Sequence, residues 1–249
     1  MKRVVAGLLF ALTGLTNLAA QPFALDYLKD NQNAIIRSDR AERRVRLLFT
    51  GHEFADGAAH ILKTLKQQKV EGYFFLTGDF VRRFPTITRQ LYRKGHYVGP
   101  HSDKHLLYCD WDKRDSLLVE KEAFLADLEA NYQALEAIGV PRQEPALYVA
   151  PYEWYNTTIS LWCTEKGIKL INFTPSTGTN ADYTYPGMDN YRSSDLLVRQ
   201  LLDKEQQNPG WLAGAHLLIH IGTDPRRTDK LYYQLGNLVS TLRERGYVL

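Results

Sequence analysis

The chain has 249 residues, of which 44% are hydrophobic and 24% are charged, and this is the composition of a folded globular domain. Its formal net charge is +3, and two of the basic residues, Lys2 and Arg3, lie in a segment that we expect to be removed. The remaining charges nearly cancel, so the charge balance gives no electrostatic case for nucleic acid or an anionic membrane surface as a partner.

Residues 1–20 have the pattern of a secretory signal peptide, because a basic tip precedes an apolar stretch over about residues 4–12 and small residues follow. A retained anchor helix is the alternative, which the short, interrupted apolar run disfavours. We therefore expect a secreted or periplasmic protein with one domain over residues 21–249 and no stable membrane insertion after the signal is removed. Export would allow Cys109 and Cys163 to form a disulfide, although two buried free thiols fit the sequence equally well.

Seven short segments are predicted to be strands of a parallel sheet. Most are continuous apolar runs, as expected for strands that are covered on both faces. In chain order they are residues 45–50, 72–77, 96–99, 146–150, 168–173, 215–221 and 247–249.

Helical patterns separate these strands. In the first, Ala58, Ile61, Leu62 and Leu65 recur at helical spacing and form one apolar face. The longest pattern covers about residues 115–138 and ends before a glycine and a proline. Further helices are predicted over residues 85–94, 155–166, 194–206 and 228–245. The alternation favours one α/β domain, either a barrel or a doubly wound sheet.

Chemically versatile side chains gather where the predicted strands end, which is where the working residues of such folds lie. His101 and His105 follow the third strand, and the spacing of four residues on one turn could direct two imidazole nitrogens toward one metal ion. A pair of histidines at this spacing is weak evidence by itself. The other strand ends supply His52, Glu53, Asp56, Tyr152, Glu153 and His220.

Four stretches in order, GYFFLTGDFVRRFP, LYRKGHYVGPHSDKH, YVAPY and LLIHIG, make the chain resemble the polysaccharide deacetylases of the NodB-homology type, which are metal-dependent carbohydrate esterases. The resemblance spans about residues 45–249 and implies a distorted (β/α) barrel of about seven parallel strands. It implies a divalent metal, with zinc as the expected ion and His101 and His105 as ligands. It also implies that Tyr152 contributes a backbone N–H to an oxyanion site, that Leu218 shapes an acetyl pocket, and that His220 is the catalytic acid.

The first motif departs from the family pattern. The family has two adjacent aspartates there, a base and then a metal ligand, and a gap-free overlay puts Gly51 and His52 in their places. His52 would complete a three-histidine zinc site with a fourth position open for water. Glu53 is the competing ligand, if a one-residue bulge turns its carboxylate inward. The arginine that orients the family's base is replaced by Val149, which is consistent with the loss of that base.

The hypothesis from the sequence is a metal-dependent hydrolase that removes N- or O-linked acetyl groups from a carbohydrate. The ion would polarise the acyl carbonyl and activate a water molecule. Glu53 or Asp56 would take the proton of this water, with Asp103 as a third candidate, and His220 would protonate the leaving group. Asp56 has an alternative role as the N-cap of the following helix.

Several aromatic residues in the loops after the strands, Trp154 among them, could stack on sugar rings. Asp182 lies in the region of the family's fourth motif and is a further expected substrate contact. The main rival hypothesis is a non-catalytic carbohydrate-binding protein on the same scaffold, with the base absent. A third is an unrelated α/β enzyme that needs no metal.

Overall fold

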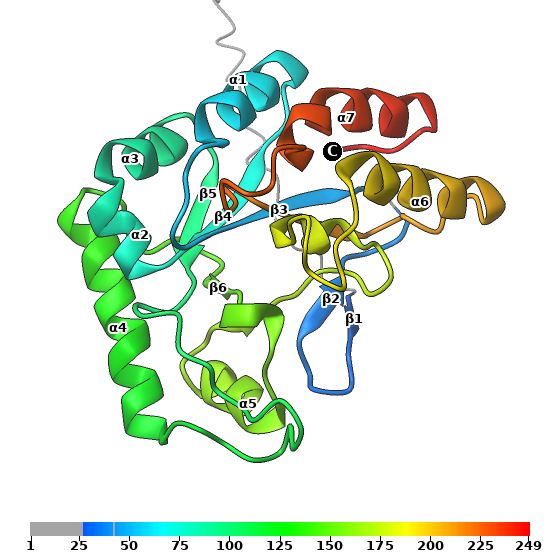
Figure 1. Ribbon diagram of the computed structural model, residues 1–249. Helices are drawn as coiled ribbons and strands as arrows, with labels where there is room; N and C mark the ends of the chain where they lie inside the picture. The colour runs from blue at the N-terminus through cyan, green and yellow to red at the C-terminus, as the bar shows by residue number, and fades with distance from the viewer. Residues whose placement is uncertain (1–26, 42) are drawn as a thin grey trace, which may run out of the picture.

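The computed structural model describes residues 27–41 and 43–249, so the predicted signal peptide lies outside the described residues. A parallel sheet of four strands, in the order β5-β4-β3-β8, forms the centre of the molecule (Figure 1). Because all four strands run the same way, their carboxyl ends meet at one edge. The strands are β3 (Arg46–Gly51), β4 (Gly72–Leu76), β5 (Tyr97–Pro100) and β8 (His216–His220).

Shorter strands continue the sheet beyond β8. The strands β6 (Leu147–Tyr148) and β7 (Lys169–Leu170) form a parallel pair, while β1 (Leu28–Lys29) and β2 (Ile35–Arg37) form an antiparallel hairpin that was not predicted. Isolated bridges join this hairpin to its neighbours, one to the residue after β7 and one to the residue before β8. The prediction of an α/β fold with a parallel sheet is confirmed.

The ring of strands is completed between β5 and β6 by side chains. In the part of the chain that the structure describes, these two strands share no backbone ladder. Instead, the Tyr97 hydroxyl accepts a hydrogen bond from the Leu147 N–H at 2.9 Å and donates to the Pro145 carbonyl at 3.2 Å. The Gln143 side-chain amide donates to the Val98 carbonyl at 2.6 Å. A side-chain seam therefore takes the place of one strand pairing.

Alternate strand residues fill the interior of this ring. Leu48 of β3 lies in register with Leu218 of β8 and Tyr73 of β4, and all three belong to one buried cluster. Leu218, expected to shape an acetyl pocket, is fully buried within this cluster. The cluster consists of Ile35, Leu48, Tyr73, Phe75, Tyr97, Leu147, Val149, Ile171 and Leu218.

Helices cover the outside of the sheet, with α1, α6 and α7 together on one side and α4 at the left in Figure 1. The predicted face of α1, formed by Ala58, Ile61, Leu62 and Leu65, is buried as expected. Within residues 27–41 and 43–249, none of the helices has the length and apolar character needed to cross a bilayer. The helices are α1 (Ala58–Gln68), α2 (Gly78–Arg83), α3 (Pro85–Arg93), α4 (Lys121–Ala137), α5 (Thr157–Glu165), α6 (Ser194–Gln207) and α7 (Leu235–Glu244).

The longest helix begins later than the periodicity predicts. It starts at Lys121 and not near residue 115, because the backbone before it pairs with the preceding loop. The Leu118 N–H donates to the Tyr108 carbonyl at 2.9 Å, and the Asp110 N–H donates to the Ser116 carbonyl at 3.0 Å. These groups are consequently not available for an additional helical turn.

Two other features settle points that the sequence left open or misplaced. The prediction of a strand over residues 247–249 is wrong, because Val248 forms only an isolated bridge with Arg44. Cys109 and Cys163 are both buried free thiols, so the disulfide alternative is not found.

Candidate active site

A cavity of about 550 Å³ opens at the carboxyl end of the sheet. It brings together the four histidines that the sequence placed at strand ends, His52, His101, His105 and His220. Carboxylates and aromatic rings complete the wall, so ionisable and apolar side chains lie side by side in the cavity. The carboxylates are Glu53, Glu153 and Asp224, and the aromatic residues include Trp111, Tyr152, Tyr183 and Tyr185.

The alternation of side chains along the strands, which we call strand phase, explains why histidines from distant parts of the chain meet here. Side chains alternate across a strand, so His220 has the same phase as the interior Leu218, and His52 continues the phase of Leu48 beyond the end of β3. His101 continues the phase of Tyr97 in the same way. Because the strands are parallel, the three imidazoles therefore lie at the same end of the sheet, around the cavity.

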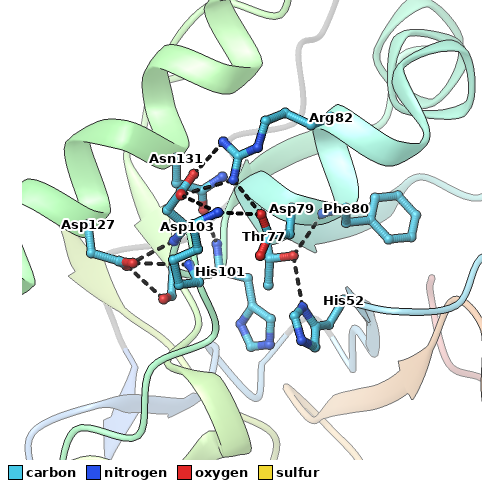
Figure 2. Close-up of polar contacts among 11 residues, drawn as sticks. His52, Thr77, Asp79, Phe80, Arg82, His101, Asp103, Asp127 and Asn131 are labelled. Carbon is cyan, nitrogen blue, oxygen red and sulfur yellow. Dashed lines mark hydrogen bonds and ion pairs between the residues drawn. The ribbon is translucent and has the colours of Figure 1, made fainter.

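The loop that carries His101 is fixed from behind by α4. Asp127 accepts hydrogen bonds from the Ser102 hydroxyl at 2.6 Å and from the backbone N–H groups of the next two residues at 2.8 and 3.0 Å. Asn131, one turn further along α4, accepts from the His101 N–H at 2.8 Å. Figure 2 shows the imidazoles of His52 and His101 on the side of the loop away from these anchors. The loop geometry is thus imposed by two buried polar residues.

His101 and His105 are neutral imidazoles. The Nδ1 of His101 lies 2.7 Å from the Val149 carbonyl, which can only accept, so Nδ1 carries the proton and Nε2 is free. Burial lowers the pKa of His101 to about 3 and that of His105 to about 2, and the neighbouring histidines lower the His105 value further. A neutral ring with one nitrogen held by a carbonyl, as in His101, is what a metal site requires of histidine.

The ring of His52 does not complete a metal site in this arrangement. It stacks on His105 with the centroids 4.4 Å apart and the planes only 7° from parallel. Imidazole lone pairs lie in the ring plane, so two stacked parallel rings cannot both direct a nitrogen to one ion at about 2 Å. His101 and His105 cross at 66° and can converge. Across residues 27–41 and 43–249, no group of three His, Cys, Asp or Glu side chains is arranged to hold a metal ion.

His220 is held by a buried carboxylate. Asp182 accepts from the His220 N–H at 3.0 Å and lies 2.6 Å from its Nδ1, which leaves Nε2 for the cavity. Burial alone would lower the pKa of His220, but the Asp182 carboxylate outweighs burial and the pKa is raised. Asp182, expected to contact substrate, is fully buried and lies outside the cavity wall. Its place in the structure is that of a positioning residue for His220.

The expected bases lie in three different situations. Glu53 is exposed at the cavity wall. Asp56 lies outside the wall, and its carboxylate accepts from the Thr223 N–H at 3.0 Å and the Tyr232 hydroxyl at 2.7 Å, with the Lys230 ammonium at 3.1 Å. Helix α1 has no side-chain N-cap bond, so the alternative capping role of Asp56 is not found either. Asp56 instead ties the start of α1 to the loop after β8.

Asp103, the third candidate, is engaged in an ion pair. Its two carboxylate oxygens accept from Arg82 at 2.7 and 2.9 Å, and its side chain is buried outside the cavity wall. Gly78 is required beside it, because a Cβ at this position would stand 1.8 Å from an Asp103 oxygen. This carboxylate therefore braces α2 against the histidine loop.

Aromatic residues form one side of the cavity. The exposed Tyr152 ring lies 4.4 Å from the His105 ring and 5.6 Å from Trp111, centroid to centroid. Trp154, expected to contact a sugar, lies behind Trp111, with the two rings stacked at 5.5 Å. Its indole N–H donates to the Asp110 carbonyl at 3.2 Å. Trp111 and Tyr152 are thus the aromatic faces that the cavity presents, and Trp154 supports the first of them.

Glu153 lines the cavity, and the sequence placed it at a strand end but gave it no role in the site. Burial raises its pKa to about 7, with Asp182 acting in the same direction and His220 opposing. The available signal was an acidic residue directly after a predicted strand and its Pro-Tyr pair. Asp127 was also missed, although it lies on the buried face of α4 beside Leu128.

The model of the polysaccharide deacetylase family matches residues 38–171. A chitooligosaccharide deacetylase of Sinorhizobium fredii is 23% identical over 233 residues, which cover 90% of this chain and 95% of that protein. A peptidoglycan-N-acetylglucosamine deacetylase of Bacillus cereus is 39% identical over 79 residues, which are 30% of this chain and only 28% of that protein.

Solved structures show the same fold. A carbohydrate esterase family 4 pseudoenzyme from Bacillus anthracis superimposes with a TM-score of 0.68 at 18% identity, over 88% of this chain and 66% of that one. A family 4 carbohydrate esterase of Bacillus subtilis gives a TM-score of 0.67 at 18% identity, over 87% and 82% of the two chains. A protein described as an esterase and one described as a pseudoenzyme therefore share this fold, so the fold by itself does not indicate activity.

Proposed function

Because the chain belongs to the polysaccharide deacetylase family, we propose that it is a hydrolase that removes acetyl groups from a carbohydrate. The observation that carries the proposal is the convergence of four histidines in one cavity, with His220 held and made more basic by Asp182. Such a pair can deliver a proton to the nitrogen or oxygen that leaves the acyl group. The substrate class is an acetylated glycan, and export directed by residues 1–20 would place the enzyme in the periplasm or outside the cell.

The aromatic wall supports a carbohydrate substrate. Trp111 and Tyr152 present ring faces beside the histidines, and sugar rings stack on such faces through their C–H groups. Tyr183 lies edge-on to His220, with the centroids 5.8 Å apart, so an aromatic surface reaches the proposed acid as well. A sugar placed between them would bring its acetyl group to the histidine cluster.

A divalent metal, zinc by the family resemblance, is part of the expected chemistry. His101 and His105 provide two suitable imidazole nitrogens, but the stacked ring of His52 does not fit a third. The proton transfers that we propose below therefore use side chains of this chain and do not pass through a metal ion.

The rival function, a carbohydrate-binding protein without activity, is favoured by one observation. Gly51 occupies the place of the family's base, and a Cβ there would lie 2.8 Å from methyl groups of Ile221 and Leu76. The sequence therefore lacks the usual aspartate, and core packing also leaves no room for an aspartate at this position. An active enzyme of this sequence needs another carboxylate.

Acetate release distinguishes the two functions. The purified chain is incubated, with and without added zinc, with N-acetylated chitooligosaccharides, peptidoglycan fragments and O-acetylated xylan, and acetate is measured enzymatically. We expect release from at least one of these substrates, and a loss of about 10²- to 10⁴-fold in the His220→Gln variant. Glycan binding without acetate release by the wild type would establish the binding protein instead. Zinc content by emission spectroscopy, with His101→Ala as control, tests the metal separately.

A further inference from the structure

We propose that Glu153 is the carboxylate that takes the proton from the attacking water, in place of the aspartate that this sequence lacks. The inference rests on the proposed hydrolase function and adds a catalytic residue to it. Glu153 lies on the cavity wall with the four histidines, at the end of the 3-10 turn η1 (Pro151–Glu153) that follows β6. It comes from a strand end other than those that carry the family's acidic motif.

The backbone of Glu153 is fixed while its carboxylate is left open. Its N–H donates to the Ala150 carbonyl at 3.0 Å, and its carbonyl accepts from the Asn172 side-chain amide at 3.2 Å. Among the residues that the structure describes, none donates a hydrogen bond to the Glu153 carboxylate. A partly buried carboxylate without a protein donor is able to bind and deprotonate a water molecule.

The other acidic residues near the cavity do not offer this combination. Asp56 and Asp103 take two or more donors each, and Asp182 is occupied by His220. Asp224 accepts from the Arg226 guanidinium at 2.6 and 2.9 Å. Glu53 is exposed to solvent, and within residues 27–41 and 43–249 no side chain forms an ion pair with its carboxylate.

Backbone conformation provides a second, independent observation. Tyr152 and Glu153 have φ values of 59° and 52°, so two consecutive residues with side chains occupy the left-handed region that favours glycine. Strained residues of this kind persist where the surrounding structure holds them, and they cluster at functional sites. A glycine would relieve the strain at position 153, yet the chain carries a glutamate whose side chain enters the cavity.

The proposed step balances within the residues of the cavity. The oxygen of water attacks the acyl carbon, the C=O π pair moves to oxygen, and the water proton passes to the Glu153 carboxylate. The tetrahedral oxyanion then collapses, the bond to the sugar nitrogen or oxygen breaks with its electron pair, and that atom takes the Nε2 proton of the His220 imidazolium, which leaves the ring neutral with its Nδ1 proton hydrogen-bonded to Asp182. Glu153 returns its proton to His220, and the acetic acid that is formed loses its own proton to solvent.

Electrostatics are consistent with this exchange. Burial raises the pKa of Glu153 to about 7, and the facing His220 and Asp182 are the two charges that influence it. A base is most effective when its pKa lies near the working pH. The pKa of His220 is raised above its ordinary value by the Asp182 carboxylate, which favours the protonated form that acts as the acid.

The experiment uses the full chain and compares Glu153→Gln, Glu153→Gly, Glu53→Gln and, as a matched control, Glu122→Gln on the exposed face of α4. Acetate release is measured from pH 5 to pH 9, and thermal unfolding is recorded for each variant. We expect Glu153→Gln to lower kcat about 10²- to 10⁴-fold with little change in KM, and to lose the rise in rate near pH 7. Glu122→Gln should match the wild type.

Glu153→Gly provides the readout that a merely structural residue would not give. It should be as inactive as Glu153→Gln and yet unfold at a higher temperature than the wild type, because glycine accepts the left-handed backbone. Wild-type activity with Glu153→Gln within threefold of it would overturn the inference and leave the hydrolase standing. Loss of activity in Glu53→Gln alone would do the same. A wild type that releases no acetate from any substrate would end both proposals.

Discussion

The replacement of Glu153 by glutamine should change how stability depends on pH. The pKa of the folded carboxyl group is raised by burial from 4.5 to about 7. At about 1.36 kcal/mol per pH unit, this interval corresponds to about 3 kcal/mol of folding free energy. Because the side chain keeps some exposure to solvent, we expect about 2 kcal/mol.

The sign follows from proton binding. Between pH 4.5 and about 7, the folded carboxyl group retains a proton that the unfolded chain has already lost, so the free energy of unfolding falls as the pH rises. Below this window the carboxyl group is protonated in both the folded and the unfolded chain. Above it the folded chain bears the full free-energy cost of a buried carboxylate. Glutamine carries no charge at any pH, so Glu153→Gln should equal the wild type near pH 4 and exceed it by about 2 kcal/mol at pH 8.

Urea denaturation followed by tryptophan fluorescence, at one-unit steps from pH 4 to pH 8, measures the difference. The raised pKa of His220 also removes stability as the pH rises, and because the Glu153 carboxylate contributes to that shift, this loss should be smaller in Glu153→Gln. The reasoning is refuted if the two stability profiles run parallel, since the carboxyl group would then ionise with ordinary affinity. Glu122→Gln serves as the control for removing an exposed charge.

Three further predictions concern the supports of the cavity. Asp127→Ala removes the acceptor of three hydrogen bonds and should lower the free energy of unfolding by about 2–4 kcal/mol in urea titrations, together with most of the activity. Gly51→Asp should lower the unfolding temperature and give no gain in acetate release, because its Cβ would stand 2.8 Å from two methyl groups; increased release would contradict this. Asp182→Asn should lower the pKa of His220, as followed by NMR titration of the imidazole protons, and an unchanged titration would refute the assigned role of Asp182.

The histidines of the cavity could be predicted because their positions depend on strand phase. Once β3, β5 and β8 are recognised as parallel strands, residues just beyond their carboxyl ends have to meet at one edge. His52, His101 and His220 follow this rule and all reach the cavity. Recognising short apolar strands that run in parallel is therefore enough to predict these three histidines of the site from the sequence.

Features that depend on side-chain rotation and on the loop backbone could not be predicted from the pattern of residue types. The stacking of His52 on His105 is set by ring orientation, which residue spacing does not encode. Glu153 enters the cavity through two left-handed residues, and no residue type announces such a turn when glycine is absent. Asp127 interrupts an apolar stripe on α4, and only the loop that it anchors reveals the reason. The hairpin of β1 and β2 is too short for periodicity to detect.

The seam between β5 and β6 joins two parts of the cavity wall. His101 follows one side of the seam and Glu153 the other, so the two halves of the site stand on strands that are joined through Tyr97 and Gln143. Besides these hydrogen bonds, the junction contains the hydrogen bond between His101 and the Val149 carbonyl and the interior packing of Tyr97, Leu147 and Val149. The relative position of His101 and Glu153 in the cavity therefore depends on two side chains at this junction, and substitutions of Tyr97 or Gln143 should affect the site although neither residue lines it.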